Sequence, residues 1–336
     1  MYICDQNVIK MKTKDKLLKL FQKHQSLKIE EIEKHLNVSR QYIHRILAEF
    51  LEDGKVVKLG SAPRTIYKIK EKKTTSIETY LISKEVNTFL NLNFLVITEI
   101  GALLQGIDAF EYWCEKRKLP IQKTLEEFLL TYKKYEGYKD TFGLISGLDK
   151  LKSTKEFKEI ALDQIWYLDF YAIERFGKTK LGNLVHYAKQ GQNIPLMKML
   201  VKEIEIPLQN IIHQYHIDAV AFVPHTVKRK IQLMDFLEKK LNLNLPKVKI
   251  LKMDGFISVP QKSLQKIEER INNAEHTFSI HESKKFQKLL LIDDAVGSGA
   301  TLNQIAKKMK AKKVAKEVFG LSIVGSFKGF DVITDV

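Results

Sequence analysis

The chain has 336 residues, of which 44% are hydrophobic, and a formal net charge of +16, a composition typical of a soluble globular protein with a sizeable core. No secretion signal and no apolar run of about 20 residues is present, so we expect a cytoplasmic protein with no membrane partner. Cys4 and Cys114 are too few and too far apart to predict a disulfide framework or a structural zinc site.

The first part of the chain is strongly basic. Residues 1–76 contain 14 Lys and 3 Arg against 9 Asp and Glu, which is a net charge of +8. A basic module favours a polyanionic partner. The alternative is that an AT-rich genome encodes many lysines, which would give the same excess of positive charge. The order of the predicted elements favours a polyanionic partner.

Apolar residues recur at helical spacing in residues 13–24, 27–37 and 38–56, and Ser39 suits the N-cap of the third helix. A tight turn at residues 37–38 separates the second helix from the third. Residues 55–70 alternate like two strands around a Gly-Ser-Ala-Pro turn. This order resembles winged helix-turn-helix domains, whose second helix of the pair enters the major groove of DNA.

That resemblance implies a DNA-binding domain over residues 1–73. The alternative is a winged helix that binds protein or dimerises, and paired half-sites make a homodimer possible. The polar and basic side chains expected to contact bases and phosphates are Ser39, Arg40, Gln41, Tyr42, His44, Arg45, Lys58 and Arg64.

The middle of the chain, residues 74–177, is rich in aromatic residues. The segments 77–119, 123–140 and 159–176 have the pattern of amphipathic helices. Aromatic stripes at this spacing are far more often core than cofactor sites. We therefore predict a helical linker domain and assign no chemistry to it.

Strands and helices alternate in residues 178–336. Strands are predicted at residues 219–223, 247–253, 288–294 and 317–325, and helices at 230–243, 262–275 and 300–311. Such alternation predicts an α/β domain with a doubly wound, mostly parallel sheet, whose ligands bind at the carboxyl ends of the strands.

The segment LLLIDDAVGSGATL, residues 289–302, places two carboxylates at the end of a buried strand, directly before a loop of small residues. Amides and hydroxyls of such a loop converge on a phosphate at a helix N-terminus. Asp293 and Asp294 would repel that phosphate unless they face a diol or a divalent cation. A ribose 5-phosphate satisfies both requirements.

This segment resembles the phosphoribosyl pyrophosphate motif of type I phosphoribosyltransferases, with Gly297 where that family usually has a hydroxyl residue. Within the family, the chain looks most like the ComF-type branch over about residues 178–326. The supporting segments are FVPHTVKRKIQ (222–232), QKSLQKIEERINNAEHTF (261–278) and KLGNLVHYAKQGQNIPLMKML (180–200). The four-cysteine zinc module that often begins ComF-type proteins is absent from the sequence.

The resemblance implies a type I phosphoribosyltransferase fold and a role for each motif residue. Asp293 and Asp294 would bind the ribose hydroxyls and orient Mg²⁺, and Arg270 or Lys262, in a segment that resembles a mobile lid, would assist catalysis. The 5-phosphate would be held by Gly297, Ser298, Gly299, Ala300 and Thr301, and the pyrophosphate would lie near His225, Thr226, Lys228 and Arg229.

Three functions remain open at this point. The chain could be a Mg²⁺-dependent phosphoribosyltransferase acting on a nucleobase. It could be a DNA-binding regulator that senses phosphoribosyl pyrophosphate or a nucleotide without turning it over. It could be an accessory protein for DNA uptake or processing, handling single strands with its basic surface. Fold analogy does not decide between binding and catalysis.

Overall fold

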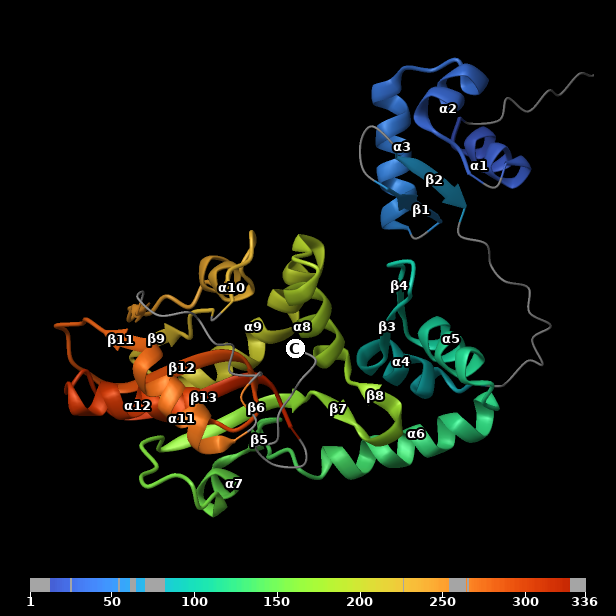
Figure 1. Ribbon diagram of the computed structural model, residues 1–336. Helices are drawn as coiled ribbons and strands as arrows, with labels where there is room; N and C mark the ends of the chain where they lie inside the picture. The colour runs from blue at the N-terminus through green and yellow to red at the C-terminus, as the bar shows by residue number, and fades with distance from the viewer. Residues whose placement is uncertain are drawn as a thin grey trace, which may run out of the picture. The chain divides into compact units, whose positions relative to one another are not determined.

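The computed structural model describes residues 13–24, 26–53, 55–60, 65–69, 82–225, 227–253, 264 and 266–326. The chain divides into two compact units, Met1–Tyr80 and Leu81–Val336 (Figure 1). The domain boundary predicted at residue 177 therefore lies within the second unit, where one hydrophobic core combines residues from both sides of it. Within the described ranges, no helix is long and apolar enough to span a membrane.

The first unit contains the elements predicted for it, three helices and a two-stranded antiparallel sheet. The helices are α1 (Thr13–Lys23), α2 (Ile29–Leu36) and α3 (Arg40–Glu52), and the strands are β1 (Val56–Leu59) and β2 (Ile66–Ile69).

The turn between α2 and α3 has the geometry that the sequence predicts. Asn37 adopts a left-handed conformation (φ 49°), which ends α2 and which asparagine tolerates better than most residues. The hydroxyl of Ser39 then accepts a hydrogen bond from the backbone N–H of Tyr42 at 3.4 Å and caps α3.

The second unit is built on a five-stranded, mostly parallel sheet with the strand order β5-β6-β13-β12-β9 (Figure 1). Only β5 runs antiparallel to its neighbour. The mixed α/β class predicted for this part of the chain is thus confirmed. The strands are β5 (Ile145–Ser146), β6 (Gln164–Phe170), β9 (Ala219–Phe222), β12 (Phe286–Val296) and β13 (Ala315–Gly325).

Hydrophobic cores lie on both faces of this sheet. Leu290 and Ile292 of β12 belong to a core shared with α8 (Lys180–Gln190), α9 (Ile194–Tyr215) and α10 (Leu233–Lys240). Leu289 and Leu291 belong to the other core, shared with α12 (Ala300–Ala311). The uninterrupted apolar run of β12 is explained by this burial on both faces.

The remaining elements cover the sheet or extend it. Lys308 of α12 and Lys312, directly after it, connect this helix to β11, because their ammonium groups donate to the carbonyls of Phe278 and Ile280 at 2.6 and 2.7 Å. These elements are α4 (Lys84–Asn93), β3 (Leu95–Ile97), β4 (Leu103–Gln105), α5 (Ile107–Arg117), α6 (Ile121–Glu136), α7 (Leu148–Ser153), β7 (Ala172–Ile173), a 3-10 turn (Glu174–Phe176), β8 (Gly177–Lys178), β10 (Ile250–Lys252), α11 (Ile267–Thr277) and β11 (Phe278–Ile280).

Three secondary-structure predictions are wrong in part. Residues 159–176, predicted as a helix, contain β6, since the run of buried residues 165–168 fits a parallel strand buried on both faces. Residues 77–119 contain the hairpin β3–β4 between two helices. Strand β10 pairs antiparallel with β11 in a sheet of its own, although Val248 just before it donates to the carbonyl of Val220 in β9.

Candidate functional site

The two aspartates of the motif lie near the carboxyl end of β12, between the ends of two parallel neighbours. Asp293 is in register with Ser322 of β13. On the other side, the N–H of Val223, directly after β9, donates to the carbonyl of Ile292 at 2.9 Å. The loop that follows β9 therefore starts beside the acid pair, as the parallel sheet predicted.

Lys189, near the C-terminus of α8, forms an ion pair with Asp294. Its Nζ lies 2.6 Å from Oδ2 of Asp294, and the exposed fractions of the two side chains are 24% and 7%. A contact this short between a cation and a buried carboxylate is a charge-assisted hydrogen bond. One of the two acids is therefore already neutralised by the protein itself.

The turn after α8 also holds the loop that follows β9. Oε1 of Gln190 accepts a hydrogen bond from Arg229 at 3.3 Å, and Oε1 of Gln192 accepts one from the N–H of Ile231 at 2.8 Å. Residues 189–192, which we name the α8 turn, thus contact both the acid pair and the predicted pyrophosphate loop. These residues belong to the segment 180–200, which resembles ComF-type proteins, but the sequence alone assigns a role to none of them.

Asp293 has a different environment from Asp294. It is partly buried, and its Oδ1 accepts the backbone N–H of Asp294 at 2.8 Å. Burial and then the neighbouring Asp294 raise its pKa to about 7, while Lys189 acts in the opposite direction. Asp293 thus lacks a full counter-charge. A cation would supply one, and hydroxyl groups of a ligand would stabilise the carboxylate by donating hydrogen bonds.

The loop between β12 and α12 forms the start of a 12-residue helix. Gly299 caps the helix in a left-handed conformation (φ 74°), which favours glycine, and the hydroxyl of the buried Ser298 accepts from the N–H of Ala300 at 3.4 Å. The first N–H groups of a helix have no partner inside it, and they give the helix N-terminus a positive potential. Gly297, Ser298, Gly299, Ala300 and Thr301 surround this N-terminus, where an anion is favoured.

Cationic side chains of the loop after β9 border the same edge. Nδ1 of His225 lies 3.8 Å from Oδ1 of Asp235, Lys228 is exposed and Arg229 is partly buried. The side chain of Gln232 fixes the loop by donating to the carbonyl of Arg229 at 3.1 Å. Thr226, also predicted here, lies outside the described residues.

Arg270 lies in α11 and is 5% exposed. Its Nε donates to the carbonyl of Leu264 at 2.9 Å, and burial lowers the pKa of its guanidinium. Helix α11 packs against α12, and Lys308 of α12 donates to the carbonyl of Phe278 at the end of α11. Arg270 is thus a buried residue of α11. Lys262 lies outside the described residues.

The acid pair fits a Mg²⁺ site only in part. Among the described residues, no group of three or more His, Cys, Asp or Glu side chains is arranged to hold a metal ion. Mg²⁺ is often bound by one or two carboxylates together with substrate phosphates. Asp293 could contribute to such a site, whereas Asp294 is paired with Lys189. The donor set thus provides at most one free carboxylate to a metal carried by the substrate.

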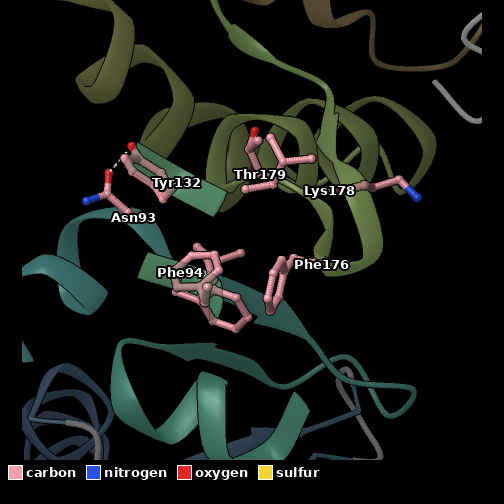
Figure 2. A pocket seen from close by; sticks show the side chains of 9 residues that line it. Asn93, Phe94, Tyr132, Phe176, Lys178 and Thr179 are labelled. Carbon is pink, nitrogen blue, oxygen red and sulfur yellow. Dashed lines mark hydrogen bonds between the residues drawn. The ribbon is translucent and has the colours of Figure 1, made fainter. Parts of the chain in front are cut away.

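A separate small pocket lies between the hairpin β7–β8 and the elements α4, β3 and α6 (Figure 2). The hydroxyl of Tyr132 donates to Oδ1 of Asn93 at 2.7 Å at its margin (Figure 2). Its volume of about 10 Å³ suits a single water molecule. None of the predicted site residues lines it; the lining residues are Asn93, Phe94, Leu95, Phe128, Tyr132, Ile173, Phe176, Lys178 and Thr179.

In the first unit, the predicted recognition residues share the exposed face of α3. Arg40, Gln41, His44 and Arg45 are exposed at positions that repeat every helical turn. The guanidinium of Arg45 lies 4.8 Å from the ring centre of the partly buried Tyr42, and Arg40 lies 3.7 Å from Glu30. Lys58 of β1 is exposed, and Arg64 lies outside the described residues.

No protein-family model matches the chain, and comparison with curated proteins gives no match to its sequence. Function is therefore inferred from the two candidate sites themselves.

Proposed function

We propose that the second unit binds a 5-phosphorylated ribose, as phosphoribosyl pyrophosphate or a nucleotide, at the carboxyl edge of its sheet. The observation that carries this proposal is the junction of β12 and α12, where two acids directly precede a glycine-capped helix N-terminus. The loop amides would bind the 5-phosphate, and Asp293 and Asp294 would accept hydrogen bonds from the ribose hydroxyls. A type I phosphoribosyltransferase-like domain of the ComF type is the family that this arrangement resembles.

Transfer at this site would break the bond between the anomeric carbon and pyrophosphate while a nucleobase nitrogen forms the new bond. The departing pyrophosphate carries the electron pair, so catalysis depends mainly on cations near it. Lys228 and Arg229 are cations of the loop after β9, and Arg270 of α11 is a further candidate. Mg²⁺ would supply further charge to the pyrophosphate when bound. Sensing without transfer needs only the binding part of this site.

Calorimetric titration of the full chain with phosphoribosyl pyrophosphate and Mg²⁺ tests the proposal. We expect wild-type protein to bind and the double variant Asp293→Asn, Asp294→Asn to bind at least tenfold more weakly, because amides accept weaker hydrogen bonds from the ribose hydroxyls. Asp149→Asn, at an exposed acid of α7, is the matched control and should bind like wild type. Equal affinities of all three proteins would contradict the assignment of the acid pair. If the protein also converts phosphoribosyl pyrophosphate and a nucleobase into a nucleotide, it is an enzyme.

The first unit supports a second candidate function, DNA binding by a winged helix-turn-helix. The supporting observation is the capped helix α3, which presents Arg40, Gln41, His44 and Arg45 to solvent on one face. Arginine and glutamine there would reach base edges, and Lys58 would contact phosphates. Combined with the first proposal, this gives a DNA-binding protein that responds to a phosphoribosyl ligand. An accessory role in DNA uptake or processing would instead show a preference for single strands.

The double variant Arg40→Ala, Arg45→Ala is expected to bind duplex DNA at least tenfold more weakly than wild type. It should also lose preference for selected over random-sequence duplexes, because the two arginines are proposed to contact base edges. Lys16→Ala, at an exposed cation of α1, is the control and should change affinity by less than threefold. Fluorescence anisotropy with random-sequence and selected duplexes provides the measurement. Unchanged affinity of the double variant would assign α3 to another partner.

A further inference from the structure

The ion pair between Lys189 and Asp294 is unusual for its position. Among the residues that the structure describes, most ion pairs join exposed side chains, such as Lys116 with Glu99 and Lys134 with Glu174. Lys189 instead directs its ammonium group to a carboxylate that is only 7% exposed, 2.6 Å away. The pair also lies at the one edge where the motif predicts a ligand.

A buried ion pair adds little net stability, because desolvation of the two charges largely cancels their attraction. Removal of one partner is nevertheless costly, since the other charge stays buried and uncompensated. The Lys189–Asp294 pair is therefore better explained by the charge that it places at this edge than by a gain in folding free energy.

The position of the ammonium group competes with a divalent cation. Mg²⁺ binds carboxylate oxygens at about 2.1 Å and requires near-octahedral ligands. An ion coordinated by Asp294 would lie within a few Å of Nζ of Lys189, and two cations that close repel each other strongly in a partly buried site. Either the ion or the ammonium group can neutralise Asp294, but not both.

Lys189 is also fixed in place by its surroundings. Gln190 and Gln192 of the α8 turn hold Arg229 and the N–H of Ile231 in the loop after β9. The ammonium group thus belongs to a segment that connects the acid pair to the predicted pyrophosphate loop. A ligand that contacted both the acid pair and this loop would therefore lie near the ammonium group of Lys189.

We propose that Lys189 is an internal counter-ion for the acid pair, so that the site binds the 5-phosphorylated ribose without a divalent metal ion. This inference rests on the proposed function of the second unit. Lys189 acts through Asp294, which it orients and neutralises, and is therefore a positioning residue. Mg²⁺ then contributes only to ligands that carry it on a pyrophosphate group of their own.

Ribose 5-phosphate is the suitable probe, because it has the 5-phosphate and the diol but no pyrophosphate to bring a metal. The full chain is titrated with it in Mg²⁺ and in excess EDTA, beside Lys189→Met, Lys189→Arg and the control Lys202→Met, at an exposed residue of α9. Wild type and Lys202→Met should bind with affinities that differ by less than threefold between the two conditions. Lys189→Met should bind at least tenfold more weakly in EDTA and recover in part with Mg²⁺, and Lys189→Arg should resemble wild type in EDTA.

Parallel titration with phosphoribosyl pyrophosphate and Mg²⁺ separates the two proposals. If that ligand binds but ribose 5-phosphate needs Mg²⁺, or does not bind at all, the role of Lys189 is refuted and the phosphoribosyl site stands. Unchanged, metal-independent binding by a folded Lys189→Met protein, with folding checked by circular dichroism, would also refute it. If neither ligand binds wild type in any condition, the phosphoribosyl site itself is refuted.

Discussion

Replacement of Gly182 by alanine is expected to destabilise the second unit by about 3 kcal/mol, at the upper end of overpacking effects. A Cβ atom built on Gly182 lies 2.1 Å from the carbonyl oxygen of Tyr171 and 3.0 Å from its carbonyl carbon. Both neighbours are backbone atoms, so no side-chain rotation can relieve the contact. The helix α8 would have to move away from the chain segment that follows β6.

Movement of α8 has a consequence for the candidate site as well as for stability. The N–H of Gly182 donates to the hydroxyl of Thr179 at 3.0 Å in the cap of α8, and the same helix carries Lys189 to Asp294 at its other end. Gly182→Ala should therefore weaken ligand binding together with folding. A substitution remote from the ligand would act through the position of the α8 turn.

Urea denaturation followed by circular dichroism measures the expected effect. Gly137→Ala is the matched control, because Gly137 ends α6 with a negative φ and its added Cβ would come no closer than 3.3 Å to another atom. We expect the control to change the free energy of unfolding by less than about 0.5 kcal/mol. If Gly182→Ala were as stable as the control, α8 would not pack as closely against the backbone of Tyr171 as the structure shows.

The parts of the site that the sequence predicted are local. The apolar run of β12, the acids that follow it and the glycine before α12 are consecutive, and each has a preference that needs no distant partner. Gly299 suits a left-handed cap, and four apolar residues in a row suit a strand buried on both faces. The helix predicted over residues 300–311 is therefore found with the same bounds.

The parts that the sequence did not predict depend on tertiary contacts. Lys189 gains its role only because the fold brings α8 against the end of β12, and a lysine in a lysine-rich chain gives no signal of its own. Strand β6 was predicted as a helix because Ile165, Trp166 and Leu168 fit either period over a short apolar run. Its pairing with β13, far along the chain, decides between the two.

The hydrogen bonds of the buried Asn303 side chain likewise depend on a distant segment that the sequence does not reveal. The side-chain oxygen of Asn303 accepts from the N–H of Ala161 at 2.8 Å, and its amide donates to the carbonyl of Glu159 at 2.8 Å. Asparagine inside a helix is unfavourable by propensity, and these hydrogen bonds to the segment before β6 explain its place in α12. Residues of the predicted linker and of the predicted α/β domain therefore share one folded unit.

Asp293→Asn is expected to stabilise the second unit at alkaline pH and to have no such effect near pH 4. The pKa of Asp293 is raised to about 7 in the folded chain, above its ordinary value of 3.8, by burial and by Asp294. The unfolded chain therefore releases this proton at lower pH than the folded chain does. The free energy of unfolding of wild type is therefore highest below pH 4, where Asp293 is protonated in both states. It falls as the pH rises through about 7, where the folded chain has to carry the buried charge.

At pH 8 the folded wild type carries two adjacent acids, of which Lys189 is paired with one. An amide at position 293 removes the uncompensated charge while keeping the shape of the side chain, so we expect a gain of roughly 2 to 4 kcal/mol at that pH. Urea denaturation of wild type, Asp293→Asn and the exposed control Asp149→Asn between pH 4 and pH 8 measures it. A gain that is the same at both ends of this range would show that burial of Asp293 as a charged group is not its cause.

If the gain does grow with pH, the folded chain keeps an aspartate where an asparagine would be more stable. Selection for folding alone would not retain such a residue, because the carboxylate of Asp293 is a cost that the fold does not require. A ligand that donates hydrogen bonds to the carboxylate would offset that cost on binding, and phosphoribosyl pyrophosphate should then raise the stability of wild type more than that of Asp293→Asn. The pH series repeated with ligand would connect the destabilised acid to the binding site.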